Sequence, residues 1–465
     1  MPRRFVVSLL AVTAAGFAVN VAAGESVSDS FDDNARTSIG SAPSPLNANC
    51  LGVSSAIALA VSADPRIDRA EANRLFAEAE MKAARSRYYP QISAFGTTGL
   101  GDTPPLDRRR DDQIGIQLNQ ELYSFGARRA ASDAARLKAE AAAIGVDGTM
   151  NDIALGAARA YIEFARAQAL QSISKSAEGI ISQDVEAADL RLRRRAITIT
   201  AASEIRARFA RQLSELVTAE SRSEANRARL SVLIDQPIDC IDPQTVPDFV
   251  LPGIDDVLDL SADEAVSLAT SRSPNLQSAE TAIEAARAEV KAAKRAALPT
   301  LSLNGFAVHF SDVEVDFFGE TTDTAEEDVR LGFSLTQDLY TGGRLKAQQQ
   351  SAIARLKQAQ SEARLERWSL EDAVRSSLGR ATAQRRAVRE LQRAEEEVRR
   401  QLALTEREYN LGTKTLTDLV RVTEIYAEIA AFKVNAVYDY YTVLFDLYAA
   451  MGVLDYPDRL ETIIR

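Results

Sequence analysis

Few residues in this sequence have side chains that could carry out chemistry. Among its 465 residues there are two cysteines, Cys50 and Cys240, and one histidine, His309. So small a set nearly excludes a zinc site of His and Cys ligands and a Cys/His pair for nucleophilic catalysis. No nucleophile with a nearby base and no pair of carboxylates for acid–base chemistry can be named either. The sequence therefore predicts no catalytic residue, no metal site and no cofactor, and a secreted enzyme is the least favoured class.

The chemistry left to the two cysteines is to pair with each other, and the N-terminus indicates a suitable compartment. Residues 1–23 begin with two arginines, continue with an apolar stretch and end in small residues, which is the order of a secretory signal peptide. A retained anchor is less favoured because the apolar stretch is shorter than the roughly 20 residues of a spanning helix. In an oxidising compartment a Cys50–Cys240 disulfide is favoured over two unpaired thiols. Residues 24–49 read as a disordered leader.

Charge excludes one class of partner and marks one segment. The net charge of -11 and the pI of about 5.0 argue against nucleic-acid binding, which requires a basic surface. The basic run Arg191, Arg193, Arg194 and Arg195 stands at the expected end of a helix. Such a run compensates the negative pole of a helix, or it contacts a partner protein or screens cargo. The sequence leaves both interpretations open.

Proline spacing predicts the elements that position these residues. There are 14 prolines, and none occurs in 106–236 or in 300–456. Because proline interrupts helices, each window is expected to hold one long helix and one shorter helix. The expected helices cover about 124–195, 198–235, 341–411 and 413–451. At 1.5 Å per residue, two short helices of roughly 58 Å placed end to end match one long helix of roughly 105 Å.

The sequence repeats itself. Pro90 matches Pro299, and Gln120-Glu121-Leu122-Tyr123 matches Gln337-Asp338-Leu339-Tyr340. The duplication predicts two halves, residues 50–235 and 260–453. A proline-rich linker, expected to be extended, occupies residues 236–259, and a C-terminal tail occupies residues 454–465.

Each half is expected to read helix, strand, strand, helix, helix. The first helices cover about 51–88 and 260–297. The strands cover about 91–101 and 113–123 in the first half, and about 300–311 and 329–340 in the second. Loops at 101–112 and 312–328 would form the outer tips, and a bulge is expected at Gly305, where the apolar alternation slips.

The strands fit an outer membrane. Apolar and polar residues alternate strictly in 113–123 and 329–340, which gives one apolar and one polar face over a length that suits a tilted membrane strand. His309 is expected in the lumen or as filler of an aromatic girdle. The girdle residues would be Tyr88, Tyr89, Tyr123, Phe306, Phe310 and Tyr340. The alternative, a soluble half-buried sheet, is disfavoured by the secretory signal and by the absence of other elements to cover the apolar faces.

Four strands cannot close a barrel, and an open sheet edge is not tolerated in lipid. The barrel interpretation therefore requires several chains, and three chains would supply twelve strands. The expected fold class is mainly α-helical with a β-barrel portion. It consists of a duplicated helix–strand–strand–helix–helix unit.

The chain resembles the TolC family of outer-membrane efflux proteins. The resemblance rests on the two repeats, on the Gln-x-Leu-Tyr-x-x-Gly strand-to-helix junctions, and on the segment that runs from Tyr409 through Gly412 to Asp418. It covers about residues 50–453. It implies a homotrimer that serves as a passive exit duct, with a trimeric twelve-stranded barrel in the outer membrane of a Gram-negative cell and a long α-helical tunnel in the periplasm. The implied partners are outer-membrane lipid, a periplasmic adaptor protein and an inner-membrane pump or ABC transporter.

The resemblance also implies a gate at the periplasmic helix tips. Tyr409, Lys414 and Asp418 occupy the positions of the gate residues, and Glu204 is the available acid in the first hairpin. The pattern departs from the family in two places: Arg421 stands where an aspartate is usual, and Ser203 stands where a carboxylate is usual. Alternatively, Tyr409 packs in a coiled coil and Asp418 starts a helix. Gly412, Arg193, Arg194 and Arg195 are the residues expected to contact the adaptor.

Two questions stay open in the sequence. The first is the cargo, which is either small molecules or a secreted polypeptide. The second is the class itself, because a soluble periplasmic coiled-coil scaffold or adaptor is the alternative to the exit duct. Strict alternation in the strands argues for the duct.

Overall fold

The computed structural model describes residues 50–103, 107–250, 254–315, 321–452 and 454. The predicted signal peptide, the leader and residues 455–465 of the tail lie outside this described part. In the described part, the order helix, strand, strand, helix, helix occurs twice.

The first half holds α1 (Val53–Ala63), α2 (Pro65–Ser86), β1 (Gln91–Thr103), β2 (Asp107–Tyr123), α3 (Ala127–Arg193) and α4 (Ile199–Ile234). The linker holds α5 (Thr245–Val250) and α6 (Ile254–Leu258). The second half holds α7 (Ala262–Arg272), α8 (Pro274–Arg295), β3 (Thr300–Val315), β4 (Thr321–Thr336), α9 (Arg344–Asn410) and α10 (Leu416–Ala450).

Each first helix is split, whereas the sequence predicted one continuous helix. The break falls before Pro65 in the first half and before Pro274 in the second. A residue that precedes proline is pushed out of helical geometry, and here that residue caps the next helix. The Asp64 side chain accepts a hydrogen bond from the Arg66 amide, and the Ser273 side chain accepts one from the Leu276 amide.

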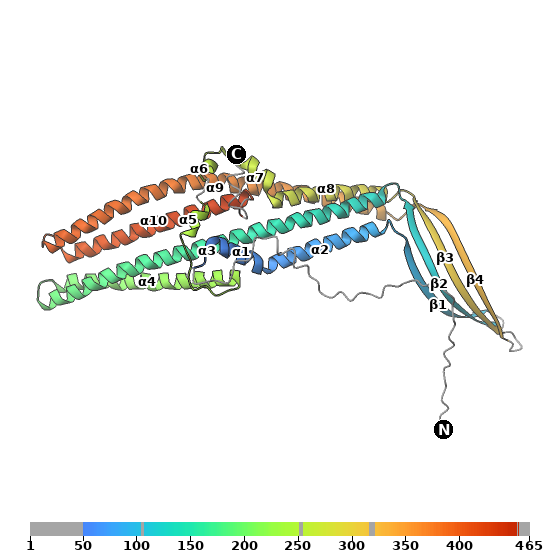
Figure 1. Ribbon diagram of the computed structural model, residues 1–465, viewed down its shortest axis with the longest axis horizontal. Helices are drawn as coiled ribbons and strands as arrows, with labels where there is room; N and C mark the ends of the chain where they lie inside the picture. The colour runs from blue at the N-terminus through green and yellow to red at the C-terminus, as the bar shows by residue number, and fades with distance from the viewer. Residues whose placement is uncertain (1–49, 104–106, 251–253, 316–320, 453, 455–465) are drawn as a thin grey trace, which may run out of the picture. The chain divides into compact units, whose positions relative to one another are not determined.

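The long helices α3 and α9 have 67 residues each, and shorter helices lie along them (Figure 1). Helices α2 and α4 contact α3, and α8 and α10 contact α9. The two halves meet where α3 contacts α8 and α10. The expected arrangement, with two short helices along each long one, is therefore present.

The strands form one antiparallel sheet with the order β1-β2-β3-β4. They extend further toward the outer tips than predicted, since Thr103 pairs with Asp107 and Val315 with Thr321. Backbone hydrogen bonds hold these pairs, so the ladder continues where the apolar alternation has ended. The predicted loops at 101–112 and 312–328 are accordingly much shorter, and β4 ends at Thr336 rather than near 340.

The predicted bulge at Gly305 is wrong. Gly305 pairs in register with Leu118 on one side and Leu331 on the other. The irregularity lies instead between Glu121 and Tyr123, at the end of β2. The apolar alternation shifts at Gly305 without a change of register, because Leu301 and Leu303 lie on one face of the sheet and Phe306 and Val308 lie on the other.

The linker was predicted to be extended, but it is folded. Its helices α5 and α6 bury Val246, Val250 and Val257 in the main apolar core. That core lies where the halves meet, and it includes the fully buried side chains of Tyr161 and Phe164 on α3 and of Phe445 and Tyr448 on α10. A second, smaller cluster lies near the helix tips and contains Ile181, Ala188, Ile205, Leu416, Leu419 and Val420.

Candidate functional site

The two helix tips are the same turn built twice. After α3, the Ala196 amide donates to the Arg191 carbonyl and the Arg195 amide to the Leu192 carbonyl. After α9, the Thr413 amide donates to Glu408 and the Gly412 amide to Tyr409. These are the paired bonds of a Schellman motif, whose central residue requires a positive φ. The φ value is 80° at Gly412 and 60° at Arg195.

A threonine begins the returning helix at both tips. Thr198 caps α4 by accepting from the Ala201 amide, and Thr415 caps α10 by accepting from the Asp418 amide. The residues predicted to contact an adaptor, Gly412 and Arg193 to Arg195, are all exposed on these turns.

Tyr409 joins the second hairpin to the first. Its ring packs on the small cluster at the tips, which we call the tip cluster. The guanidinium of Arg191, at the end of α3, lies 4.8 Å from the ring centroid. This cation–π contact crosses from one hairpin to the other, so Arg191 does more than compensate a helix pole.

Asp418 is fully engaged within its own helix end. It forms a capping box with Thr415, whose hydroxyl donates to the carboxylate at 2.7 Å. Its second oxygen accepts from Arg421 at 2.6 Å. The hydrogen bonds from Thr415, followed by the charges of Arg421 and Lys414, hold the pKa of the Asp418 carboxyl below its usual range. Arg421, the departure from the family pattern, thus neutralises Asp418 within the chain.

Glu204 does not contact Tyr409, Lys414 or Asp418 in this chain. It accepts from Arg208 at 3.0 Å, four residues further along α4. Arg208 in turn donates to Glu424 on α10, and Arg211 donates to the same carboxylate at 3.2 Å. Arg208, Arg211 and Glu424 were not among the site residues predicted from the sequence. The spacing of Glu204 and Arg208, a helical i,i+4 pair, was the available signal.

Asp184 is the unusual acid near the tips. One of its carboxylate oxygens is buried and has no hydrogen-bond partner among the described residues. Burial raises its pKa to about 6, and the charge of Arg191 offsets only part of that effect. Nothing in the sequence pattern marks this residue, because its burial depends on the packing of the two hairpins.

The predicted disulfide is present between Cys50 and Cys240, with 4.8 Å between the Cα atoms. The bond ties the start of the first half to the linker, where Leu51 and Ile241 form a parallel bridge. The Tyr161 hydroxyl lies 2.8 Å from the Leu51 carbonyl and 2.7 Å from that of Asp242. Burial raises the pKa of this tyrosine to about 12, so it stays protonated as a donor.

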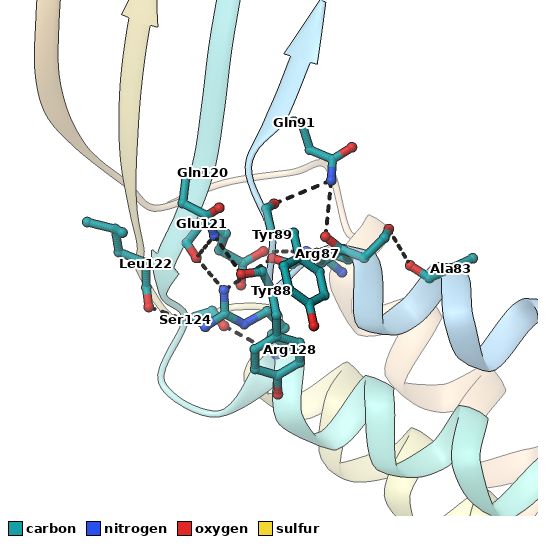
Figure 2. A network of polar contacts seen from close by, with 11 residues as sticks. Ala83, Arg87, Tyr88, Tyr89, Gln91, Gln120, Glu121, Leu122, Ser124 and Arg128 are labelled. Carbon is teal, nitrogen blue, oxygen red and sulfur yellow. Dashed lines mark hydrogen bonds and ion pairs between the residues drawn. The ribbon is translucent and has the colours of Figure 1, made fainter. Parts of the chain in front are cut away.

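The sheet is joined to the helices by a polar junction (Figure 2). Arg128, in the first turn of α3, donates to the carbonyls of Glu121, Leu122 and Arg87, and its guanidinium lies 4.1 Å from the centre of the Tyr88 ring. Gln120 donates to the Tyr88 carbonyl at 3.2 Å. These contacts connect the ends of α2 and β2 to the start of α3.

The glutamine of the junction motif makes the same hydrogen bond in both halves. Gln337 donates to the Ala297 carbonyl, as Gln120 does to Tyr88. The glycines of the motif, Gly126 and Gly343, have φ values of 82° and 88°. Glycine adopts such values without strain, which explains the residue types of the repeated motif.

One face of the sheet is apolar and exposed. Opposed residues in an antiparallel pair share a face, and the register places Ile92, Leu118 and Leu331 in one row and Ile116 and Val329 in the next. Leu331 and Val329 are 70% and 75% exposed. Such a surface is unfavourable in water and suits lipid.

One residue of the predicted girdle lies differently from the expectation. Phe306 is on the opposite, polar face, and the guanidinium of Arg330 lies 5.6 Å from the centre of its ring. His309 shares a row with Ile114 at the border of the apolar face, a place that suits girdle filler. The side chain of Phe310 lies outside the described residues.

Within the described part of the chain, no helix is both long enough and apolar enough to cross a membrane. Nor do three or more His, Cys, Asp or Glu side chains gather there as a metal site.

Comparison with known proteins identifies the family of this chain. Residues 56–235 and 265–453 match the family model described as outer membrane efflux protein. The chain is 24% identical over 399 residues to the outer membrane protein TolC of Vibrio cholerae serotype O1, covering 86% of this chain and 90% of that protein. It is 24% identical over 373 residues to the outer membrane efflux protein BepC of Brucella suis biovar 1, with coverage of 79% and 78%.

Solved structures share the fold. The outer membrane protein VceC of Vibrio cholerae matches with a TM-score of 0.71 at 20% identity, covering 86% of this chain and 96% of that one. The open state of the Neisseria gonorrhoeae MtrE outer membrane channel matches with a TM-score of 0.71 at 19% identity, with coverage of 88% and 93%.

The paired long hairpins and the four-stranded sheet give this chain the same fold as the outer membrane channels VceC and MtrE. The chain belongs to the outer membrane efflux protein family. It is a transport protein of the outer membrane and not an enzyme.

Proposed function

We propose that this chain is one subunit of a homotrimeric exit duct that is passive, spans the outer membrane and continues through the periplasm as a helical tunnel. The observation that carries the proposal is the four-stranded sheet, which has an exposed apolar face and two unpaired edges, β1 and β4. An open edge in lipid leaves backbone groups without partners. Three copies of this sheet would supply twelve strands and remove every edge.

Exposed apolar side chains also occur on the helices. Phe76 on α2 is 68% exposed, and Trp368 on α9 is 60% exposed. Helices α2 and α9 lie at opposite ends of the contact series α2–α3–α8–α9. A neighbouring copy would cover both side chains, so the same association that closes the barrel would close the tunnel wall.

Membrane fractionation and size measurement test the assembly. The full chain is expected in the outer-membrane fraction and as a trimer in mild detergent. The alternative, a soluble periplasmic scaffold or adaptor, predicts a species in the soluble fraction without detergent. Recovery of a soluble monomer would overturn the proposal that the chain forms an exit duct.

The tips are proposed as the gate and as the contact for a periplasmic adaptor that links the duct to an inner-membrane pump or ABC transporter. Tyr409, Lys414 and Asp418 surround the turn at Gly412, and Arg193 to Arg195 cover the other turn. Links of this kind, open to water, contribute only about 0.5–1.5 kcal/mol each. Docking energy could therefore break them without unfolding the trimer.

Tyr409→Phe combined with Asp418→Ala tests the gate. We expect a higher single-channel conductance in planar bilayers and greater sensitivity to large antibiotics. Because Asp418 also caps α10, Asp418→Asn is the matched control that loses the charge and keeps an acceptor for Thr415. Unchanged conductance in an assembled trimer would mean that these side chains only pack and cap.

The cargo class is tested separately. Deleting the gene and measuring both drug sensitivity and the secreted proteome distinguishes small-molecule efflux from export of a polypeptide.

A further inference from the structure

The ion pairs that join the two halves share one polarity. Among the described residues, the cation always comes from the first half and the anion from the second. The pairs are Lys138–Glu289, Arg159–Asp446, Arg166–Asp439, Arg208–Glu424 and Arg211–Glu424. Four of the five lie along the seam between α10 and the first hairpin. This seam must loosen if the second hairpin is to move relative to the first.

Apolar packing supports this seam unevenly. The pairs at Asp446 and Asp439 lie beside the main core, where Tyr161 and Phe445 are completely buried. The pair at Glu424 lies beside the small tip cluster. Between the two clusters, four buried side chains are polar, namely Gln212, Ser223, Glu395 and Thr423, and the buried apolar side chains there, chiefly alanines with Leu216 and Val422, belong to neither cluster. Because the tip cluster is separate from the main core and much smaller, it is suited to open locally while the main core stays packed.

Glu424 is the strongest polar link at this end of the seam. Its side chain is only 11% exposed, and it accepts from the two guanidinium groups of Arg208 and Arg211. A buried carboxylate held by two cations is costly to leave unpaired. In an open tip water would reach all three groups, so the link can be broken and remade without loss of the fold.

We propose that Glu424, held by Arg208 and Arg211, is a positioning residue of the gate: it clasps α10 to α4 and sets how readily the tip of the second hairpin separates from the first. The proposal rests on the gating at the helix tips proposed above. It assigns control to a site on the seam that is separate from Tyr409, Lys414 and Asp418. Glu204 belongs to this clasp, because it orients Arg208.

Glu424→Gln tests the clasp, and Glu215→Gln is the matched control. Glu215 also pairs with Arg211, but it lies on α4 and does not cross the seam. Glutamine keeps the shape of Glu424, and Arg208 keeps Glu204 as a partner, so no buried cation is stranded. A second variant, Arg208→Lys, retains the charge and loses the forked geometry.

The readout is the distance between the hairpins, measured by pulsed electron paramagnetic resonance. Spin labels go on Ser203→Cys and Thr413→Cys, both exposed positions at the tips. The native cysteines are paired with each other, so only the new thiols react. The labelled full chain is diluted with unlabelled chain, so that distances within one subunit dominate, and conductance is recorded on the same trimers.

In Glu424→Gln we expect the fraction of separated tips to rise about tenfold, which corresponds to about 1.4 kcal/mol, with a parallel rise in conductance. Arg208→Lys should give a smaller rise, and Glu215→Gln none. If Glu424→Gln and Arg208→Lys leave the distance unchanged while Tyr409→Phe with Asp418→Ala lengthens it, the clasp is refuted and tip gating stands. If no variant changes distance or conductance, gating at the tips fails as well. A rise of the same size in Glu215→Gln would also overturn the clasp.

Discussion

Asp184 makes the packing of the tips dependent on pH. Its folded pKa is raised to about 6 because burial penalises the charged carboxylate. The unfolded value is about 4. Between these values the packed form binds a proton that the exposed form has lost. The stability of the packed tips therefore falls as pH rises from about 4 to about 6, and it is flat above that range.

Asp184→Asn is expected to remove this dependence. Thermal unfolding of the trimer in detergent, followed between pH 4 and pH 7, measures it. The variant should be more stable than the parent near pH 7 and nearly equal to it near pH 4. Asp189→Asn is the control, since Asp189 lies on the same helix and is paired with Arg206 at 2.6 Å. Identical pH profiles for the parent and Asp184→Asn would contradict the role of burial.

Arg195 occupies the left-handed position that glycine occupies at the other tip. A residue with a Cβ pays about 1 kcal/mol for that conformation, so Arg195→Gly should protect the amides of the first tip from hydrogen exchange. Gly412→Ala should expose those of the second tip. Equal exchange in Arg195→Gly and the parent would indicate that the turn gains nothing from glycine.

The helices and strands could largely be predicted from the sequence, because their periodicity and proline spacing are local properties. The helix breaks at Pro65 and Pro274 were missed, since an amphipathic pattern continues across each break. The folded linker was missed because its burial depends on distant partners such as Tyr448, whose hydroxyl donates to the Val250 carbonyl. Composition alone made it look extended.

The disulfide should matter mainly where the first half meets the linker. It closes a loop with a sequence separation of 190 residues, and in the chain-entropy model such a closure contributes roughly 4–5 kcal/mol. Replacing both cysteines with serine should lower the melting temperature and expose the linker to proteolysis, with the strand-to-helix junction intact. A melting temperature equal to that of the parent would show that the bond adds nothing to the folded linker.

The assembled protein should distinguish the two faces of its sheet. Leu331 lies in the middle of the apolar rows. The next residue, Gly332, lies on the other face, where an added Cβ would meet no atom within 4 Å. Leu331→Lys should destabilise the barrel by about 2–4 kcal/mol in lipid, and Gly332→Lys should be tolerated. Refolding into bilayers with urea titration measures both. Equal tolerance of the two lysines would argue against a lipid-facing surface.

The candidate site was foreseen only in part. Tyr409 and Gly412 belong to a contiguous segment, so their position at a tip could be predicted from the sequence. The contacts of Tyr409 with Arg191, and of Glu204 with Glu424 through Arg208, join helices that are about 200 residues apart in the chain. Such pairings depend on how the hairpins pack, and one sequence carries no record of them.

The shared polarity of the ion pairs between the halves has a consequence for how this chain can evolve. A duplicated unit starts with two interchangeable copies, each able to associate with itself. Here the first copy presents arginine and lysine and the second presents aspartate and glutamate, so two first halves or two second halves would repel along the same surface. The halves have become a complementary pair, so a charge reversal in one half should be better tolerated when the other half carries the matching reversal.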